Sequence, residues 1–259
     1  MPIARLDSRA LIRVSGPDAG PFLHNLLTQD VETLAPGALR FGALLSAPGK
    51  LLFDLFLWGE DDGVVLDVAA ERRDALLQRL AMYRLRANVQ IMPLPDFVYV
   101  AWGEAVEGFV PDPRLPALGG RRWGDQSPLD ATEADWQAHR LALGVPDPSA
   151  DAPPDTTYPI EADFDLLNGI DFAKGCFVGQ ETTSRMKRRG TLKKRMAPIA
   201  FDGAPPPFGA EVLNGDLRAG EVLSGSGGRA MALLRLDRLD GALTVDGRPV
   251  RVEMPGWLT

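Results

Sequence analysis

Residues 174–181 read Lys-Gly-Cys-Phe-Val-Gly-Gln-Glu, and this run holds the only thiol of the 259-residue chain, Cys176, between two glycines. Glycine lets the backbone come close to a ligand, so a loop of this composition can leave the thiol accessible. If Lys174 lies on the same face as Cys176, its ammonium favours the thiolate, which is the reactive form of cysteine. Free cysteine is also among the most buried residue types. The residues alone therefore leave Cys176 open between a reactive thiol and a small core residue.

A short helix is expected after the loop, with Glu181 in its first turn and residues 187–189 in its last. An acidic residue lies in its first turn, basic residues lie in its last turn, and Gly190 is placed to end it. Seven basic residues crowd the segment 185–195 of a chain that is acidic elsewhere: Arg185, Lys187, Arg188, Arg189, Lys193, Lys194 and Arg195. Helix capping accounts for a minority of them. The segment is either a solvated surface or a site for a polyanion such as nucleic acid.

The N-terminal half mixes strand and helix patterns. Strands are expected at 11–14, 39–45, 51–58, 64–68, 89–92 and 97–102, and helices are expected after Gly16 and from Glu71 to about Arg86. Residues 46–50, Ser-Ala-Pro-Gly-Lys, have turn chemistry between two of these strands, so a hairpin is the simplest arrangement. This order of helices and antiparallel strands favours an α+β fold over a Rossmann sheet.

Asp54 is the single charged residue in the apolar run 51–58, Leu-Leu-Phe-Asp-Leu-Phe-Leu-Trp. A strand here places Asp54 on one face with Leu52, Phe56 and Trp58, and leaves the other face wholly apolar. A buried carboxylate must be paired or neutral. Asp54 therefore either accepts structural hydrogen bonds or meets the donors of a ligand. Glu161, in a loop-like segment, is a weaker candidate because acidic loop residues are usually solvated.

The second half of the chain changes its pattern twice. A helix is expected from Thr132 to Leu143, and the Pro-rich polar segment 146–155 is expected to be an exposed loop or linker. From about Thr191 onward, short strands alternate with Gly and Pro, at 197–201, 211–213, 221–224, 230–236 and 250–254. Short strands at this spacing indicate a small antiparallel β-barrel. The chain thus divides into an α+β region, 1–190, and a C-terminal barrel, 191–259.

Composition limits the classes of function. The chain is 45% hydrophobic and 24% charged, which is ordinary for a soluble protein with a sizeable core. No apolar stretch is long enough to span a bilayer and the first residues do not resemble a secretion signal, so we expect no membrane association and a cytoplasmic location. The net charge of −7 disfavours a long nucleic-acid footprint. One cysteine and two histidines far apart in sequence, His24 and His139, predict no metal site and no Cys₄ cluster.

The run 174–181, followed by Arg185 and the basic residues 187–189, resembles the K-G-C-[YF]-x-G-Q-E motif of the YgfZ family. Proteins of this family are similar in fold to the aminomethyltransferase (T-protein) of the glycine cleavage system. The N-terminal run 16–30, Gly-Pro-Asp-Ala-Gly-Pro-Phe-Leu-His-Asn-Leu-Leu-Thr-Gln-Asp, and Pro48-Gly-Lys50 before the Asp54 strand also resemble the family. The motif is long and specific, and the resemblance covers nearly the whole chain.

The resemblance implies a ring of three subdomains around a central folate channel, two of them intertwined in 1–190 and the barrel as the third. It implies tetrahydrofolate or a derivative as cofactor, iron-sulfur client or assembly proteins as partners, and a role in assembling or repairing iron-sulfur enzymes. Cys176 matches the functional cysteine of the family, and Asp54 matches the aspartate that aminomethyltransferases use beside the folate nitrogens, so these are the expected catalytic residues. The expected folate contacts are Asp54, Glu161, Lys174, Phe177, Gln180 and Arg185.

Two other functions stay open. Asp54 is consistent with a folate-dependent aminomethyl or one-carbon transferase, because a carboxylate near the folate amine can orient it or move a proton. The transferases have no cysteine that matches Cys176, and their reaction needs none, so the complete motif favours the maturation role. The basic segment 185–195 is consistent with an RNA-binding or tRNA-modification factor, although the net charge makes nucleic acid an unfavourable partner. The same segment could instead hold the glutamate tail of a folate.

Overall fold

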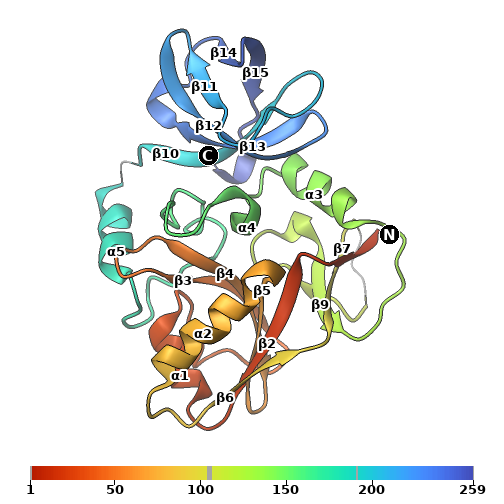
Figure 1. The fold of residues 1–259 in the computed structure, drawn as a ribbon, viewed down its shortest axis with the longest axis vertical. Coiled ribbons are helices and arrows are strands. Elements are labelled where there is room, and N and C mark those ends of the chain that lie inside the picture. Colours follow the sequence, from red (N-terminus) through yellow and green to blue (C-terminus); the bar gives the residue numbers. More distant parts are fainter. Residues whose placement is uncertain (1, 104–106, 191, 259) are drawn as a thin grey trace.

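The computed structural model describes residues 2–103, 107–190 and 192–258, and its strands form three antiparallel sheets (Figure 1). A five-stranded and a four-stranded sheet lie in the larger body, and a closed six-stranded barrel lies at the top of Figure 1. The α+β class and the C-terminal antiparallel barrel predicted from the sequence are confirmed. None of the helices in the described ranges is both long enough and apolar enough to cross a membrane.

The five-stranded sheet is built around a hairpin and carries two helices. Its order is β3 (Leu39–Leu45), β4 (Leu51–Glu60), β5 (Gly63–Ala69), β2 (Arg9–Ser15) and β6 (Gln90–Leu94). The helices are α1 (Ala19–Leu26) and α2 (Arg73–Arg84). The predicted turn 46–50 joins β3 to β4, and the two strands pair in register from Leu39 with Trp58 to Leu45 with Leu51.

Strand β4 is buried on both faces, because it lies inside the sheet and both faces of the sheet are covered. Phe53, Leu55 and Leu57 belong to the hydrophobic cluster that also contains the apolar residues of α1 and α2. Phe56 and Trp58 belong to a second cluster, which joins this sheet to the rest of the molecule. The predicted alternation therefore separates two cores from Phe53 to Trp58. It is wrong at the start of the strand, because Leu51 belongs to the second cluster and Leu52 packs against the first.

The four-stranded sheet has the order β1 (Ile3–Leu6), β7 (Phe97–Ala101), β9 (Gly120–Gly124) and β8 (Val110–Pro111). The consecutive strands β1 and β2 lie in different sheets, so the chain passes from one sheet to the other within two residues. Strands β1, β8 and β9 were not predicted, because they are short and lack a clean apolar alternation. Helix α3 (Glu133–Ala142) follows this sheet and begins at a capping box formed by Thr132 and Asp135.

The barrel has the strand order β10 (Lys194–Ala200), β13 (Arg229–Arg235), β12 (Leu217–Ser226), β11 (Glu211–Asn214), β14 (Leu243–Val245) and β15 (Arg248–Val252), and β15 closes onto β10. Small and β-branched residues such as Ala197, Ile199, Val222 and Val245 fill its interior. Thr191, where the sequence pattern changes, lies outside the described residues. Four 3₁₀ helices complete the described chain: Ala70–Arg72, Pro116–Leu118, Leu236–Arg238 and Gly256–Leu258.

The prediction of an exposed loop at 146–155 is wrong for its first half. This half forms a one-turn helix, α4 (Pro148–Asp151), whose Asp151 is completely buried. The Asp151 carboxylate accepts hydrogen bonds from Arg140 of α3 at 3.1 Å and from the backbone N–H of Ser224 in β12 at 3.0 Å. The segment therefore fastens the barrel to α3, and its polar composition serves buried hydrogen bonds.

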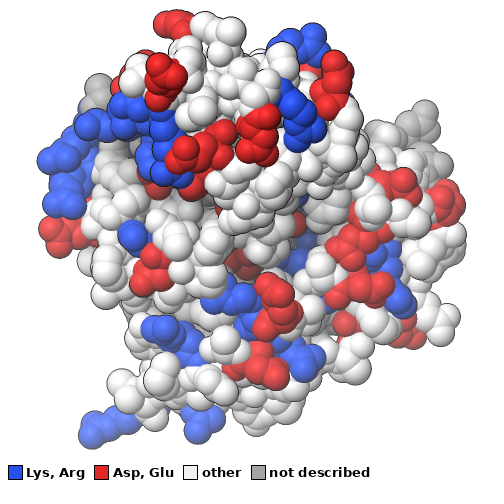
Figure 2. Space-filling view, turned by 45° about the horizontal axis from the view of Figure 1, so that its top comes forward, with Lys and Arg blue, Asp and Glu red and all other residues white. Residues whose placement is uncertain are grey.

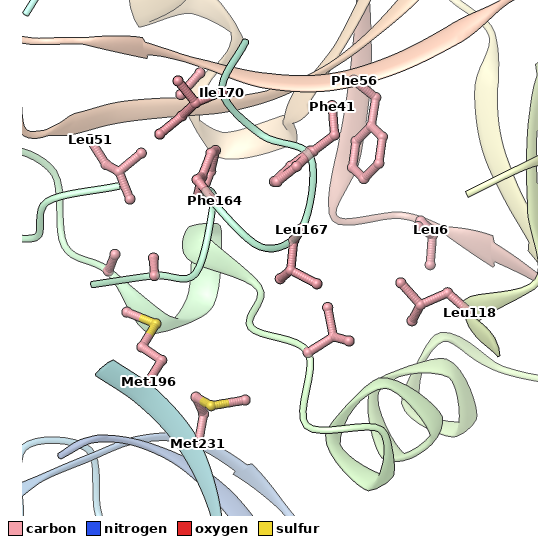
Figure 3. Close-up of a cluster of buried hydrophobic side chains, with 14 of the residues drawn as sticks. Leu6, Phe41, Leu51, Phe56, Leu118, Phe164, Leu167, Ile170, Met196 and Met231 are labelled. Atoms are coloured by element: carbon pink, nitrogen blue, oxygen red, sulfur yellow. The ribbon is translucent and has the colours of Figure 1, made fainter. Parts of the chain in front are cut away.

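A central hydrophobic cluster joins the three sheets (Figure 3). Phe41 packs against Phe56 and Phe164, with ring centroids 5.0 and 4.6 Å apart. Met196 and Met231 enter the same cluster from the barrel, as Figure 3 shows. Apolar side chains thus fill the middle of the molecule, where the three sheets meet.

Candidate functional site

The loop of residues 174–179, called the Cys176 loop below, packs backbone to backbone against the β3–β4 turn. A Cβ on Gly179 would lie 2.7 Å from the carbonyl oxygen of Ser46 and 2.8 Å from the Cα of Gly49. A Cβ on Gly49 would lie 2.9 Å from the carbonyl oxygen of Gly179. Both glycines also have positive φ, 81° and 90°, which favours glycine. Two of the segments that resemble the family in sequence, the Cys176 loop and the β3–β4 turn, are therefore in direct contact.

Lys174 fastens the loop to the end of α1. Its Nζ donates hydrogen bonds to the carbonyl oxygens of His24 and of Leu27, the second at 2.7 Å. An ammonium at the C-terminal end of a helix is stabilised by the unpaired carbonyls there. Burial lowers the pKa of Lys174 to about 8, while Asp30 and Asp171 act in the opposite direction. Lys174 thus positions the loop.

Cys176 is exposed at the outer side of this loop. The next residue, Phe177, is 7% exposed and belongs to the central cluster, and the Nζ of Lys174 lies 5.3 Å from the centroid of its ring. Two neighbours anchor the loop and leave the thiol facing outward. The exposure of Cys176 excludes the alternative of a small core residue.

Helix α5 (Gln180–Arg189) follows the loop, as predicted, and ends at Gly190 in the left-handed conformation with φ 66°. Its residues Arg185, Lys187, Arg188 and Arg189 are exposed. Lys187 lies 3.7 Å from the carboxylate of Asp165. Gln180 begins the helix and is half-buried.

Arg195 is the partly buried member of the basic segment. It lies 2.7 Å from the carboxylate of Asp163 and 2.9 Å from that of Asp165. Burial raises the pKa of Asp163 to about 8, although its hydrogen bond with Arg195 lowers it. The second carboxylate oxygen of Asp163 is buried without a hydrogen-bond partner among the described residues. These contacts tie β10 of the barrel to the segment before the Cys176 loop.

Asp54 lies in a buried ion pair that the sequence did not predict. One of its carboxylate oxygens accepts a hydrogen bond from Arg9 of β2 at 2.7 Å, and both side chains are nearly inaccessible. Arg9 also donates to the carboxylate of Asp67 at 2.6 Å. The structural alternative for Asp54 is therefore present, and it occupies one of the two oxygens.

The pair belongs to a buried charge network between the two open sheets. Its other ion pairs are Arg121 with Asp67 at 2.7 Å, Arg114 with Asp112 at 2.8 Å and Arg121 with Asp112 at 3.8 Å. The Arg121 guanidinium lies over the Phe56 ring, with its Cζ 3.7 Å from the ring centroid. Burial raises the pKa of Asp112, but Arg114 and Arg121 lower it more, and the result is below its ordinary value. Arg114 and Arg121 thus favour the ionised form of Asp112.

The cavity that borders Asp54 is small. Its volume of about 10 Å³ is enough for roughly one water molecule. Its walls include Phe53, Arg72 and the α4 residues Pro148 and Ser149. None of the other five expected folate contacts, Glu161, Lys174, Phe177, Gln180 and Arg185, lines it. Asp54 and the Cys176 loop therefore do not share this cavity.

A larger hollow of about 510 Å³ lies beside this cavity and shares Ala69 and Ser149 with it. Asp7, Glu71, Gln137 and Asp147 also border the hollow. Helix α4 lines both spaces, through Pro148 and Ser149 in the cavity and Ser149 and Ala150 in the hollow.

Glu161 is half-buried in the segment that precedes the Cys176 loop. Its carboxylate accepts a hydrogen bond from the backbone N–H of Tyr158 at 3.1 Å, and its backbone carbonyl accepts one from Met196 at 2.8 Å. Burial raises the pKa of Glu161, against that hydrogen bond and the charges of Lys194 and Lys50. These contacts give Glu161 a structural role at the junction with the barrel.

Sequence reasoning missed Arg9 and its partners. Asp67 gave a signal of the same kind as Asp54, because it is a lone carboxylate in the apolar strand β5. Reasoning on sequence also set His24 aside, yet its Nε2 lies 4.0 Å from where a Cβ on Gly175 would be, beside the Cys176 loop. His139 stacks on Trp102 instead. Among the residues that the structure describes, no group of three or more His, Cys, Asp or Glu side chains could hold a metal ion.

Comparisons with known proteins give three results. Residues 193–259 match the family model described as CAF17, C-terminal beta-barrel domain. The chain is 31% identical to the human protein "Iron-sulfur cluster assembly factor IBA57, mitochondrial", over 98% of this chain and 84% of that protein. It is 30% identical to the mouse protein of the same name, over 93% and 79%.

The fold is also similar to a solved structure. The crystal structure of glycine cleavage system aminomethyltransferase T from Bartonella henselae matches with a TM-score of 0.78, over 99% of this chain and 86% of that chain. The sequence identity is 18%, so this likeness concerns the fold. The aminomethyltransferase-like architecture expected from the sequence is confirmed.

Proposed function

Because the chain belongs to the IBA57/YgfZ (CAF17) family of iron-sulfur cluster assembly factors, we propose that it binds tetrahydrofolate and acts in the assembly or repair of iron-sulfur enzymes, with Cys176 as its functional thiol. The observation that supports this proposal most is the exposed Cys176 on a loop held at both sides by Lys174 and Phe177. A fixed, accessible thiol is suited to contact with a partner protein.

In this proposal the iron-sulfur cluster is cargo and partner proteins supply most of its ligands. Clusters are usually held by four cysteine thiolates, and this chain has one. Cys176 therefore takes part in cluster chemistry or thiol redox handling while a client or assembly protein carries the cluster. The cytoplasm is the setting that we propose from the sequence, whereas the names of the human and mouse relatives say mitochondrial.

Tetrahydrofolate fits the chemistry beside Asp54 but not the space in this conformation. Arg9 donates to one carboxylate oxygen of Asp54, and Asp54 lines the cavity. The other oxygen can therefore accept hydrogen bonds from the N–H groups of a pterin. A cavity of about 10 Å³ does not admit a pterin ring. We therefore propose that folate binding moves α4 and uses the hollow beside it, with Asp54 as the polar anchor.

Client-enzyme activity tests the role of the loop. In cells that depend on this chain, Cys176→Ser and Lys174→Ala should each reduce the activity of client iron-sulfur enzymes while the variant proteins stay folded. Arg86→Ala is the matched control, because Arg86 is exposed and has no ion pair among the described residues. Full client activity in both loop variants would remove the proposal.

Calorimetric titration with tetrahydrofolate tests the cofactor. A carboxylate bonded to ligand donors contributes on the order of 1.5 to 3 kcal/mol, so Asp54→Ala should weaken binding about ten- to hundredfold. Asp202→Ala, at an exposed carboxylate, is the control and should leave the affinity unchanged. A wild-type chain that does not bind tetrahydrofolate would contradict the folate part alone.

A folate-dependent aminomethyl or one-carbon transferase is the second candidate, favoured by the position of Asp54 and by the shared fold. In such a reaction Asp54 would orient the folate amine. The test measures the formation of methylenetetrahydrofolate from an aminomethyl donor. Good folate binding without turnover would exclude this function and leave the first one standing.

A further inference from the structure

Five basic side chains form an exposed strip that follows the Cys176 loop: Arg185, Arg188, Arg189, Lys193 and Lys194, called the basic strip below. Each is exposed, and none has an ion pair within the described ranges. Residues 182–201 contain no Asp or Glu in a chain whose net charge is −7. Figure 2 shows Lys and Arg side chains gathered at its upper left, over α5 and the start of β10. This positive charge, without ion-pair partners in the described ranges, favours the binding of an external anion.

The basic strip continues into a hollow on the outside of the barrel. The hollow has a volume of about 300 Å³, and its walls include Lys194, Arg218, Arg235 and Arg238. Arg218 and Arg235 are already paired with Glu221 at 2.7 Å and Asp237 at 2.9 Å. Lys194 has no such partner in the described chain and links the hollow to the strip. The hollow has room for one acidic side chain or a terminal carboxylate.

Exposed apolar side chains border the basic strip. Phe172 is 38% exposed, and the Nζ of Lys187 lies 5.2 Å from the centroid of its ring. Leu166 is 39% exposed and follows Asp165, which pairs with the same lysine. Aromatic and arginine side chains together are typical of protein–protein interfaces. Binding to phosphates alone would require only the cations.

We propose that the basic strip, with Phe172 and the barrel hollow, is the docking surface for an acidic segment of a partner protein. This inference rests on the proposed function, since the partner is the protein whose cluster or thiols meet Cys176. Helix α5 has ten residues and is about 15 Å long, which matches a few turns of a partner helix. The exposed apolar side chains Leu166 and Phe172 beside the strip favour a protein segment over RNA.

Docking at this surface would place the partner beside the exposed thiol. Cys176 precedes α5 by four residues, and Phe172 precedes Cys176 by the same number. The basic strip and Phe172 thus lie on both sides of the thiol along the chain. The partner would be held by charge and apolar contact while Cys176 stays free for chemistry.

Fluorescence anisotropy with the full-length chain tests the inference. The probe is a labelled dodecamer of repeated Glu-Glu-Leu, compared with the Gln-Gln-Leu dodecamer and with an oligouridine of equal length. The acidic peptide should bind, and its affinity should fall with salt because exposed charges are screened. The double variant Arg188→Glu with Arg189→Glu should weaken binding about tenfold, since each reversal removes an attraction and adds a repulsion. The control Arg84→Glu with Arg86→Glu changes the net charge equally at exposed positions of another surface and should have less than about a twofold effect.

Three results would overturn the inference: no binding of the acidic peptide, equal effects of the two double variants, or tighter binding of oligouridine with the same loss in Arg188→Glu with Arg189→Glu. The last result would assign the surface to nucleic acid. Client-enzyme activity separates this inference from the proposed function. If Cys176→Ser abolishes client activity and the double reversal does not, the function stands and the docking surface is wrong.

Discussion

Asp54 and Cys176 differ in their burial and in what their neighbours contact. Asp54 is 6% exposed and shares Arg9 with Asp67, in a network of Arg and Asp side chains between two sheets. Cys176 is exposed, and the residues around it hold the loop rather than the thiol. The first region uses its charges for stability. The second uses its backbone contacts to present one side chain.

This difference indicates which region depends on a conformational change to function. Cys176 is accessible as the chain stands, so a partner protein can reach it without rearrangement. Asp54 lines a cavity of about 10 Å³, so a ligand larger than water can reach it only if the cavity enlarges, and α4 forms part of its wall. Folate binding should therefore change the structure near α4, whereas contact at Cys176 should leave the fold as it is.

The largest expected effect comes from breaking the buried network at Arg9. Arg9→Met keeps the length of the side chain but leaves Asp54 unpaired and Asp67 with Arg121 alone. Removing one partner of a buried ion pair costs about 3 to 5 kcal/mol, because the remaining charge stays desolvated. We expect the free energy of unfolding, measured by urea denaturation, to fall by this amount.

The matched control for Arg9 lies in the same strand. Arg13 pairs with Glu60 at 2.6 Å in a partly exposed position, so Arg13→Met should cost less than about 1 kcal/mol. Adding Asp54→Asn to Arg9→Met should recover part of the loss, because the unpaired charge is then removed. Equal costs for Arg9→Met and Arg13→Met would contradict a structural role for the network.

A smaller effect is expected where the Cys176 loop meets the β3–β4 turn. Gly179→Ala adds a Cβ that would lie 2.7 Å from the Ser46 carbonyl oxygen, at a residue with φ 81°. Gly190→Ala has the same kind of backbone strain, with φ 66°, but its Cβ would meet no atom within 4 Å. Because of this contact, Gly179→Ala should lower the free energy of unfolding by about 1 to 3 kcal/mol more than Gly190→Ala does. Equal costs for the two variants would show that the close packing of loop and turn is unimportant.

Sequence reasoning predicted the elements with strong local signals. Strand β3 was predicted with its observed limits, and α5 with its glycine stop, because hydrophobic alternation and capping are written within a few neighbouring residues. The apolar run with its lone carboxylate identified Asp54 as a special position. The motif identified the Cys176 loop, and the structure supplied the exposure of its thiol.

The parts that were missed depend on contacts between distant segments. Arg9 precedes Asp54 by 45 residues and reaches it through the pairing of β2 with β5 and of β5 with β4. The segment 146–155 is polar and Pro-rich, which predicted exposure, but Asp151 is buried because Arg140 and Ser224 supply hydrogen bonds. Local composition shows that a segment is polar. It does not show whether a distant segment supplies hydrogen-bond partners that allow its polar groups to be buried.

A third prediction concerns pH and the buried carboxylate of Asp163, which joins the barrel to the segment before the Cys176 loop. Burial raises its pKa to about 8 in the folded chain, and an aspartate in the unfolded chain titrates near 3.9. Between these values the folded chain binds the additional proton, so the contribution of Asp163 to stability decreases as pH rises. Asp163→Asn should remove this dependence. The free energy of unfolding of the variant, relative to that of wild type, should therefore rise by about 1 kcal/mol per pH unit between pH 5 and pH 7.

Urea denaturation of wild type and Asp163→Asn at several pH values measures this difference. Asp237→Asn is the control, because Asp237 is an exposed carboxylate whose pKa is lowered by its hydrogen bond with Arg235. The difference in the free energy of unfolding between Asp237→Asn and wild type should be flat across the same range. The reason is that Asp237 is ionised there in both the folded and the unfolded chain. A flat difference for Asp163→Asn as well would mean that Arg195 keeps Asp163 ionised and would contradict the prediction.

The smallest expected effect on stability belongs to the residue with the largest expected effect on function. Cys176 is exposed and no described residue depends on it for a hydrogen bond, so Cys176→Ser should change the free energy of unfolding by less than about 0.5 kcal/mol. Urea denaturation checks this value, and alkylation of the native chain with iodoacetamide checks that the thiol reacts without unfolding. A loss of several kcal/mol in Cys176→Ser would assign the thiol to the structure, and its effect on client enzymes would then follow from instability. A change within the expected limit, together with lost client activity, would separate the chemistry of Cys176 from the stability that the chain derives from its buried charges.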